Sequence, residues 1–417
     1  MPQATPAPHA PSRPYALRGA LLGVSMGISN ALSFAVVVIL ARPLGPADFG
    51  AYAALTAYGI LLAIPAGAFQ VVVARTVADP TKPTTGWRLA MQIGVLLAGC
   101  TVLASPWVAT ILHLNSAWAV ILTGLTLIPM TVTGVFQGIL LGTHRIGALS
   151  VLYIATAGMR VAAASAVAIL GLRLTATVAL LLIAGLLTAA VGWTLCRAEL
   201  TDTPSTRPGL ARLLWRSQLT LAAFVALTNV DVLLARQVLS AHDSGGYALA
   251  ATFARALAWG TQFIALLVIP RLGAPGAARV LLRASALILL IGGFGLVLTG
   301  LAPEWWITLA GGSDYADSAW LVPWCVGVGT CWALAQVWMF SQMGNDRRGL
   351  GMFAFAAVTV EILIVLLWLR ESATQILTVT GGVALAVAIV GLIVTLRLQS
   401  TTAGPPSRSG AVTTDRA

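Results

Sequence analysis

Long apolar segments, each about as long as a membrane-crossing helix, recur along the whole chain. Between Leu89 and His144 no Asp, Glu, Lys or Arg interrupts the sequence, and similar windows precede and follow it. About 20 helical residues cross a hydrocarbon core about 30 Å thick, so a charge-free stretch of 18 or more residues predicts a span. The pattern predicts an all-α polytopic membrane protein with about twelve transmembrane helices, at 17–41, 51–76, 89–112, 116–141, 147–171, 175–196, 213–239, 246–270, 279–301, 320–343, 349–369 and 374–397.

The order of spans and polar segments divides the chain into two lobes. We expect an N-lobe at 17–196 and a C-lobe at 213–398, joined by a cytoplasmic linker at 197–212. The end segments 1–16 and 399–417 are rich in Pro, Ala, Ser, Thr and Gly, which is typical of disordered tails. The first apolar segment is too long for the core of a secretory signal, so it is predicted to be a retained first helix.

Composition and charge fit the same class. Hydrophobic residues make up 58% of the 417 residues and charged residues only 9%, whereas soluble domains carry about 25% charged residues. With both termini assigned to the cytoplasm, eighteen of the 24 Lys and Arg residues fall on the cytoplasmic side and four on the outer side. This asymmetry follows the positive-inside rule and predicts a cell-membrane protein with both ends inside. The net charge of +11 is therefore a topology signal and does not indicate nucleic acid as a partner.

Two sets of residues recur at a nearly constant offset in the two halves. Ala41-Arg42 after the first span matches Ala235-Arg236 after the seventh, and Gly50-Ala51-Tyr52 matches Gly245-Gly246-Tyr247. Two further loop matches follow at similar offsets. Six spans per half start each half on the same side of the membrane, so the repeats are parallel. We therefore expect two parallel six-helix repeats around a central cavity, a geometry suited to a transporter.

One motif resembles a known family. The run Arg42-Pro43-Leu44-Gly45-Pro46-Ala47-Asp48-Phe49-Gly50-Ala51-Tyr52 is similar to a segment of bacterial polysaccharide flippases, and Asn229-Val230-Asp231 with Gly246-Tyr247-Ala248 and the run 307–319 resemble other parts of the same family. These flippases belong to the multidrug/oligosaccharidyl-lipid/polysaccharide exporter superfamily. The resemblance implies that a polyprenyl-(pyro)phosphate-linked oligosaccharide is moved from the cytoplasmic to the outer leaflet by alternating access. It implies the lipid bilayer and the lipid-linked saccharide as partners, with glycan polymerases or glycosyltransferases as candidate partners, and no cofactor.

Arg160 and Glu361 place opposite charges near the middle of the fifth and eleventh spans. Their offset of 201 nearly equals that of the preceding loops, so they are predicted to occupy equivalent places in the two lobes. A charge at membrane depth costs about 2.5–3.5 kcal/mol and usually faces protein or water. Arg160 is a candidate phosphate ligand, because a guanidinium matches phosphate oxygens, and Glu361 is a candidate proton-responsive group. The alternative is that each satisfies a polar neighbour within its own lobe.

Asp231 and Arg255 lie at similar depths on the seventh and eighth spans, which form a hairpin. Equal depth favours an ion pair, because removing one partner would leave the other charge buried alone. If Arg255 instead faces the cavity unpaired, it becomes a second phosphate ligand. The sequence is compatible with both the ion pair and the phosphate ligand.

Uncharged polar side chains add further candidates. In the seventh span Ser217, Thr220, Phe224, Thr228 and Asp231 form one stripe, which faces either a water-filled cavity or a neighbouring helix. The cavity-lining amides that we predict within spans are Asn30, Gln70, Gln137, Asn229 and Gln262. Amides bind sugar hydroxyls, but they also join helices by hydrogen bonds.

Two other functions compete with saccharide flipping. A cation-coupled multidrug exporter of the same superfamily needs an intramembrane carboxylate; the first six spans contain none, but Asp231 and Glu361 leave a site in the C-lobe open. A membrane enzyme would need a large outer loop with acid–base groups, whereas the connections are short and the outer face carries only His113 and His242. No nucleotide-binding loop and no metal-ligand spacing is present. We therefore expect a transporter with no catalytic residues and no metal.

Overall fold

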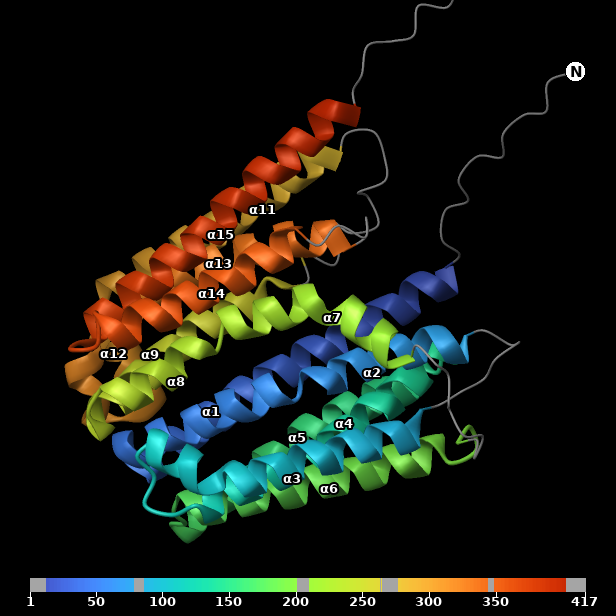
Figure 1. The fold of residues 1–417 in the computed structure, drawn as a ribbon, viewed down its shortest axis with the longest axis horizontal. Coiled ribbons are helices and arrows are strands. Elements are labelled where there is room, and N and C mark those ends of the chain that lie inside the picture. Colours follow the sequence, from blue (N-terminus) through green and yellow to red (C-terminus); the bar gives the residue numbers. More distant parts are fainter. Residues whose placement is uncertain are drawn as a thin grey trace, which may run out of the picture.

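The computed structural model describes residues 13–78, 86–200, 210–262, 264, 277–343 and 349–402, and every regular element in these ranges is a helix. Figure 1 shows the helices running side by side in two groups that follow the two halves of the sequence. This all-α membrane architecture confirms the predicted fold class. The predicted tails and the linker fall mostly outside the described residues, although the first helix begins at Arg13 and the last ends at Thr402.

The first half forms what we call the N-lobe. Its helices are α1 (Arg13–Leu62), α2 (Ile64–Val77), α3 (Trp87–Ile111), α4 (Trp118–Gly142), α5 (Ile146–Leu170) and α6 (Leu174–Cys196). Within the N-lobe, α4 packs against α2, α3 and α6, and α5 packs against α1 and α6. These helices correspond to the first six predicted spans.

The long helix α1 contains two membrane crossings. Its backbone leaves the helical conformation at Gly45, where φ is 65° and ψ is 171°. Only glycine adopts such a conformation readily, because a Cβ would clash with the backbone. The chain turns back at this point (Figure 1), so residues before Gly45 form the first crossing and residues after it begin the second, which α2 completes.

The second half forms what we call the C-lobe. Its helices are α7 (Leu210–Leu227), α8 (Val230–Val238), α9 (Ala241–Gly260), α11 (Ala277–Leu301), α12 (Pro303–Gly311), the 3₁₀ helix η2 (Ser313–Ser318), α13 (Leu321–Met343), α14 (Gly349–Leu367) and α15 (Ala373–Thr402). The seventh predicted span is therefore broken into α7 and α8, and the eighth predicted span extends beyond the described end of α9.

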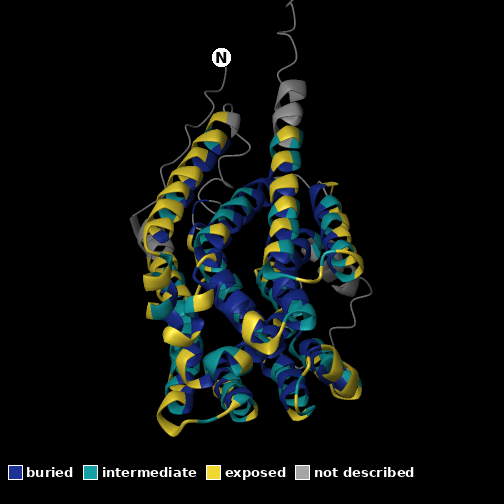
Figure 2. Ribbon diagram, turned by 90° about the vertical axis from the view of Figure 1, so that its left-hand side faces the viewer, coloured by how far each residue is buried: buried dark blue, intermediate teal, exposed yellow. Residues whose placement is uncertain are grey.

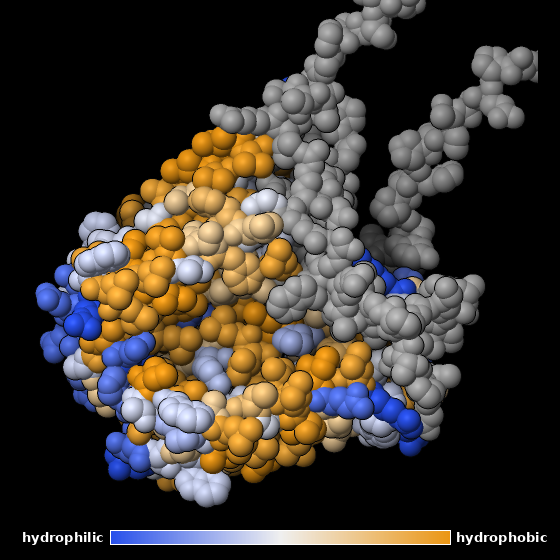
Figure 3. All heavy atoms as spheres, in the orientation of Figure 1, coloured by the Kyte–Doolittle hydropathy of each residue, from blue (hydrophilic) through white to orange (hydrophobic). Residues whose placement is uncertain are grey.

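Hydrophobicity and surface exposure identify the protein as a multi-pass membrane protein. Ten stretches of the described residues are long and apolar enough to cross a membrane, and one of them, Leu21–Val77, contains the two crossings that meet at Gly45. Together with α9, the described helices account for the predicted twelve crossings. Figure 2 shows exposed residues along the outward faces of the helices, and these include large apolar side chains such as Leu103, Ile169 and Leu290. Figure 3 shows that hydrophobic residues cover the flanks of both lobes.

Small residues set the spacing between α2 and α4. Gly134, Gly138 and Gly142 lie four residues apart on α4 and face the backbone of α2. A Cβ at Gly138 would lie 2.8 Å from the carbonyl oxygen of Gln70, which is too close for a real side chain. Because lipid offers no hydrophobic driving force for helix association, close backbone contact of this kind supplies packing energy. The contact fixes the spacing between α2 and α4, which both line a cavity inside the N-lobe.

Candidate functional site

A cavity of about 530 Å³ lies inside the N-lobe and is closed on one side by the C-lobe. The second half of α1, together with α2, α4, α5 and α6, supplies most of its wall. The C-lobe contributes Leu221 and Val225 of α7 and Trp259 of α9. Ligand sites in proteins commonly measure about 300–1,000 Å³ and are mainly apolar with a few polar groups. The size and position of this cavity make it the candidate functional site.

Arg160 is the charged residue among those that line this cavity. It occupies the middle of α5, about 21 Å along the helix from its first residue at 1.5 Å per residue. Within the described part of the chain, no hydrogen bond or ion pair satisfies its guanidinium, whereas Arg255, at a similar place in α9, is paired with Asp231. A half-buried cation without a partner in a water-accessible cavity attracts an anion.

Amides and hydroxyls line the same cavity as Arg160. Gln70 and Gln137 line the cavity, and the side-chain amide of Gln70 donates to the Tyr153 hydroxyl at 2.7 Å. The hydroxyls of Thr123 and Thr188 also reach the wall, but both donate to carbonyl oxygens of their own helices. These two threonines therefore keep their oxygen lone pairs as acceptors, whereas the amides of Gln70 and Gln137 and the guanidinium of Arg160 supply donors.

Asp231 and Arg255 form an ion pair inside the C-lobe. Nη2 of Arg255 lies 2.7 Å from Oδ1 of Asp231, and the Tyr247 hydroxyl donates to the other carboxylate oxygen at 3.3 Å. The guanidinium also lies over the Trp332 ring, 5.7 Å from its centroid. Neither charge lines the cavity. Of the two interpretations of this pair, the geometry favours the structural one.

The break between α7 and α8 lies beside this ion pair. The helix stops at Leu227 and restarts at Val230, which leaves carbonyl groups without helical partners. Nε of Arg255 donates to the Thr228 carbonyl at 2.9 Å, and the Asn229 amide donates to the Val225 carbonyl at 2.8 Å. Asn229 is thus placed at the helix break and away from the cavity wall.

The polar stripe of the seventh span faces the interior of the C-lobe from Thr220 to Asp231, and the side chain of Ser217 lies outside the described residues. Thr220 lies against Gly351 of α14, and the Phe224 ring contacts those of Trp259 and Phe340. The adjacent face of α7 carries Leu221 and Val225 into the cavity wall. The stripe therefore joins helices, which was one of its two predicted roles.

Glu361 is buried between α14 and α15, with none of its surface exposed. One carboxylate oxygen accepts a hydrogen bond from the Thr380 hydroxyl at 2.7 Å, and the other has no hydrogen-bond partner in the described structure. Glu361 and Arg160 lie at similar depths in their helices, but only Arg160 reaches the cavity. The predicted equivalence therefore holds for position along the helix and not for environment.

Two predicted amides lie outside the cavity wall. Asn30 is exposed on α1, one turn from Phe34, whose ring lies 6.2 Å from that of Phe253 in α9. Gln262 follows the end of α9 and is half-buried. Of the nine predicted site residues, the cavity therefore brings together Gln70, Gln137 and Arg160.

The lobes are joined at the end of the bundle opposite the start of α1 and the end of α15, which we call the distal end (Figure 1). Arg236 of α8 is only 6% exposed and reaches across to the N-lobe. It donates to the carbonyl oxygens of Leu112 at 3.0 Å, His113 at 3.3 Å and Ala47 at 3.3 Å. A fourth bond holds the Ser244 hydroxyl at 3.1 Å. This arginine thus fastens the C-lobe to the loop after α3.

Two other contacts reinforce the distal end. Arg42 donates to the carbonyls of Thr308 and Leu309 at the end of α12, at 3.4 and 3.0 Å, and the Tyr315 hydroxyl donates to the Ala41 carbonyl at 2.8 Å. Arg42 and Tyr315 were not among the predicted site residues and were not identified as inter-lobe contacts. The Ala-Arg pair that is repeated after the first and seventh spans was the one sequence feature that pointed to these inter-lobe contacts.

Glycine allows the two backbones to touch there. A Cβ at Gly50 would lie 2.8 Å from the amide nitrogen of Gly245, and a Cβ at Gly245 would overlap the carbonyl oxygen of Pro46. Both glycines are buried. Side chains at these positions would separate the lobes, so the repeated glycines are required for the closed distal end.

Structural comparison shows that the chain shares its fold with solved membrane transporters. The chain is similar to a multidrug resistance MATE family transporter in its inward-facing conformation, with a TM-score of 0.68 and 12% identity over 93% of this chain and 100% of that one. It is also similar to a MOP superfamily transporter from Pyrococcus furiosus, with a TM-score of 0.58 and 13% identity over 92% and 96%. A third similar structure is the eukaryotic MATE transporter AtDTX14, with a TM-score of 0.60 and 13% identity over 93% and 96%.

Sequence comparison identifies the family. Residues 17–274 match the family of polysaccharide biosynthesis proteins, and the chain belongs to this family. A comparison with curated proteins gives no match. The matched residues include the Arg42–Tyr52 motif, so the family match confirms the relationship to polysaccharide biosynthesis proteins that this motif indicated.

Proposed function

We propose that this protein is a flippase that moves a polyprenyl-phosphate- or pyrophosphate-linked oligosaccharide across the membrane for cell-surface polysaccharide synthesis. The observation that carries the proposal is the guanidinium of Arg160, which has no partner among the described residues and lies in the wall of a cavity at the middle of α5. Arginine binds phosphate oxygens in a bidentate manner, and such bonds strengthen in a site of low dielectric constant. Arg160 binds the phosphate of the lipid carrier, and Gln70 and Gln137 donate to sugar hydroxyls.

The charge of the cavity supports this substrate over the cationic drugs of a multidrug exporter. No Asp or Glu is among the described residues that line it, so the wall carries one positive charge. A cationic drug would meet that charge without a carboxylate to bind it. The intramembrane carboxylates, Asp231 and Glu361, are both buried within the C-lobe and are held by other side chains.

The closed distal end supports a direction of transport. With both termini in the cytoplasm, as the charge distribution predicts, the Arg236 and Arg42 contacts lie at the outer surface. A cavity closed at that end receives the headgroup from the cytoplasmic leaflet while the polyprenyl tail stays in the lipid. Release of the distal contacts then opens the cavity to the outer leaflet, as alternating access between parallel repeats requires.

Deletion of the gene tests the proposed function. We expect the lipid-linked saccharide to accumulate on the cytoplasmic leaflet and surface glycan to be lost. Expression of the wild-type chain is expected to restore surface glycan and to remove the accumulated intermediate. The control variant Arg370→Ala, which removes an exposed arginine from the connection between α14 and α15, is expected to do the same. Arg160→Ala, expressed at the same level in the membrane, is expected to do neither. A deletion strain with normal surface glycan and no accumulated intermediate would overturn the proposal.

A further inference from the structure

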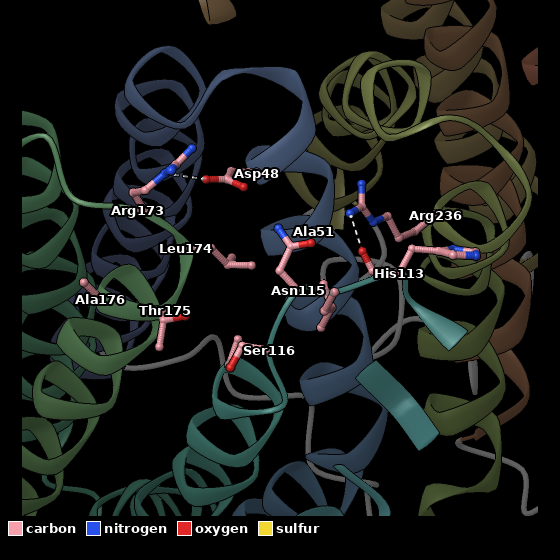
Figure 4. A pocket seen from close by; sticks show the side chains of 12 residues that line it. Asp48, Ala51, His113, Asn115, Ser116, Arg173, Leu174, Thr175, Ala176 and Arg236 are labelled. Carbon is pink, nitrogen blue, oxygen red and sulfur yellow. Dashed lines mark hydrogen bonds and ion pairs between the residues drawn. The ribbon is translucent and has the colours of Figure 1, made fainter. Parts of the chain in front are cut away.

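A second cavity, of about 390 Å³, opens at the distal end. Its wall combines the second half of α1, the loop after α3, the first turn of α6 and, from the other lobe, Arg236 of α8. Figure 4 shows Arg173 and Asp48 on one side of this pocket and Arg236 beside His113 on the other. The pocket differs from the main cavity in that charged and polar side chains make up much of its wall.

The wall carries more positive than negative charge. Arg173 and Arg236 face one carboxylate, that of Asp48, which lies 3.7 Å from Nε of Arg173. Arg236 has no carboxylate within ion-pair distance among the described residues, and its partners are carbonyl oxygens and a hydroxyl. These four bonds use four of the five N–H groups of a guanidinium. A buried cation with a remaining donor thus lines the pocket.

The first turn of α6 adds donors to the same wall. Leu174, Thr175 and Ala176 line the pocket, and no side chain caps the start of this 23-residue helix. The first amides of a helix have no intrahelical acceptors and carry partial positive charge. The side chains of Asn115 and Ser116 lie on the wall between α6 and Arg236. The donors converge from both lobes on one pocket.

We propose that this distal pocket is a binding site for a small oxyanion, a carboxylate or a phosphate. The guanidinium groups and the free amides of α6 bind the anion, and Asp48 holds the Arg173 side chain, which is 91% exposed, at the entrance. Two sources present this chemistry at the outer surface: the acidic sugars of an exported glycan and free phosphate. Because Arg236 belongs to the C-lobe and the other groups to the N-lobe, the site is complete only when the distal end is closed. The anion site itself does not depend on flipping, whereas an exported glycan as the source of the anion rests on the proposed function.

Calorimetric titration of the purified full chain in detergent tests the site with three probes: inorganic phosphate, glucuronate and glucose. We expect phosphate and glucuronate to bind and glucose not to bind. Tighter binding of glucuronate assigns the site to an acidic saccharide, and tighter binding of phosphate assigns it to the free ion. Equal binding of glucose and glucuronate, or no binding of either anion, would overturn the proposal.

Matched variants locate the binding. Arg173→Gln is expected to weaken the affinity about fivefold, because Arg173 is exposed, and Arg236→Gln to weaken it more. Arg370→Gln removes the same charge from the distal side outside the pocket and is expected to leave the affinity unchanged. If Arg173→Gln and Arg370→Gln changed the affinity equally, the anion would respond only to the overall charge of the protein. That result would contradict a specific binding site in the pocket.

A pair of glycine variants tests the two-lobe construction. Gly245→Ala, which prevents the close contact with Pro46, is expected to abolish anion binding although every lining residue is present. Gly260→Ala adds the same methyl group to α9 in open space and is expected to bind normally. Unchanged anion binding by a folded Gly245→Ala protein would place the site in the N-lobe alone. If Gly245→Ala does not fold, the result for Arg173→Gln decides.

Discussion

Arg42 and Arg236 occupy equivalent positions in the two halves of the chain, and each donates to carbonyl oxygens at the end of a helix in the opposite lobe. Arg42 reaches the end of α12, and Arg236 reaches the residues that follow α3. The contact is therefore reciprocal, as expected where parallel repeats face each other across an axis along the membrane normal. The two arginines act as a pair of latches that hold the distal end closed.

The latches differ in strength, which leads to the first prediction. Arg236 is buried and makes four hydrogen bonds, whereas Arg42 is exposed and makes two. We expect Arg236→Ala to destabilise the closed distal end by about 2–4 kcal/mol and Arg42→Ala by about 0.5–1.5 kcal/mol. The measurement is the distance between spin labels at Trp118→Cys and Trp305→Cys, exposed positions on different lobes, in a chain whose four native cysteines are replaced. Unchanged distances in Arg236→Ala would mean that other contacts hold the lobes together.

The second prediction concerns the packing of α2 on α4. Gly138→Leu is expected to lower stability by about 1–3 kcal/mol, because its side chain meets the backbone of Gln70 and overpacking forces the helices apart. Gly99→Leu on α3, where no atom lies within 4 Å of the added Cβ, serves as the control. Thermal unfolding in detergent measures both. Equal midpoints for the two variants would contradict the role of close backbone contact.

The Asp231–Arg255 pair gives the third prediction. Asp231→Ala leaves the Arg255 charge buried without its partner, and we expect a loss of about 3–5 kcal/mol in stability. Exchange of the two residues, Asp231→Arg with Arg255→Asp, is expected to recover part of this loss relative to either single change. The comparison of unfolding midpoints among the three variants checks the pair. If the exchange recovers nothing while transport is also lost, the charges act on the substrate instead.

Glu361 supplies the fourth prediction. The carboxylate is buried with one hydrogen-bond donor, Thr380, and an ionised group in that place costs several kcal/mol. Glu361→Gln keeps an acceptor for Thr380 and removes the charge, so the unfolding midpoint is expected to stay the same or rise. Thr380→Val is expected to cost about 1–3 kcal/mol, because it leaves Glu361 without that donor. Thr359→Val, on the exposed face of α14, is the control. A large loss of stability in Glu361→Gln would indicate that the charge itself is held by the fold.

The sequence predicted the fold well because the signal was long and redundant. Charge-free stretches mark the spans wherever a helix faces lipid, and the predicted 89–112 agrees with α3 at Trp87–Ile111 within two residues. The break between α7 and α8 was not predicted, because the local sequence Thr228-Asn229 contains neither Pro nor Gly. The break is stabilised by Arg255 from another helix. The hydrophobic periodicity of the seventh span does not indicate such a contact between helices.

The candidate site was harder to predict, because depth in the membrane does not specify a direction around the helix. Arg160 and Glu361 have similar depths, yet one lines the cavity and the other is buried between α14 and α15. The stripe on the seventh span was likewise predicted to face either a cavity or a neighbouring helix. The neighbouring side of the helix, with Leu221 and Val225, is the one that closes the cavity. Neither Arg42 nor Arg236 was predicted to join the lobes, since their carbonyl partners lie far away in the sequence.

The most direct test of the account compares the binding of a short polyprenyl phosphate with that of the corresponding polyprenol to the purified protein. The two probes differ only in the phosphate, so the affinity ratio isolates the interaction with the cavity guanidinium. We expect the wild-type protein to prefer the phosphate by about tenfold or more, the gain from a charge-assisted bond, and Arg160→Gln to lose the preference while still binding the polyprenol. An unchanged preference in correctly folded Arg160→Gln would show that Arg160 does not bind the headgroup and would contradict the proposed mechanism.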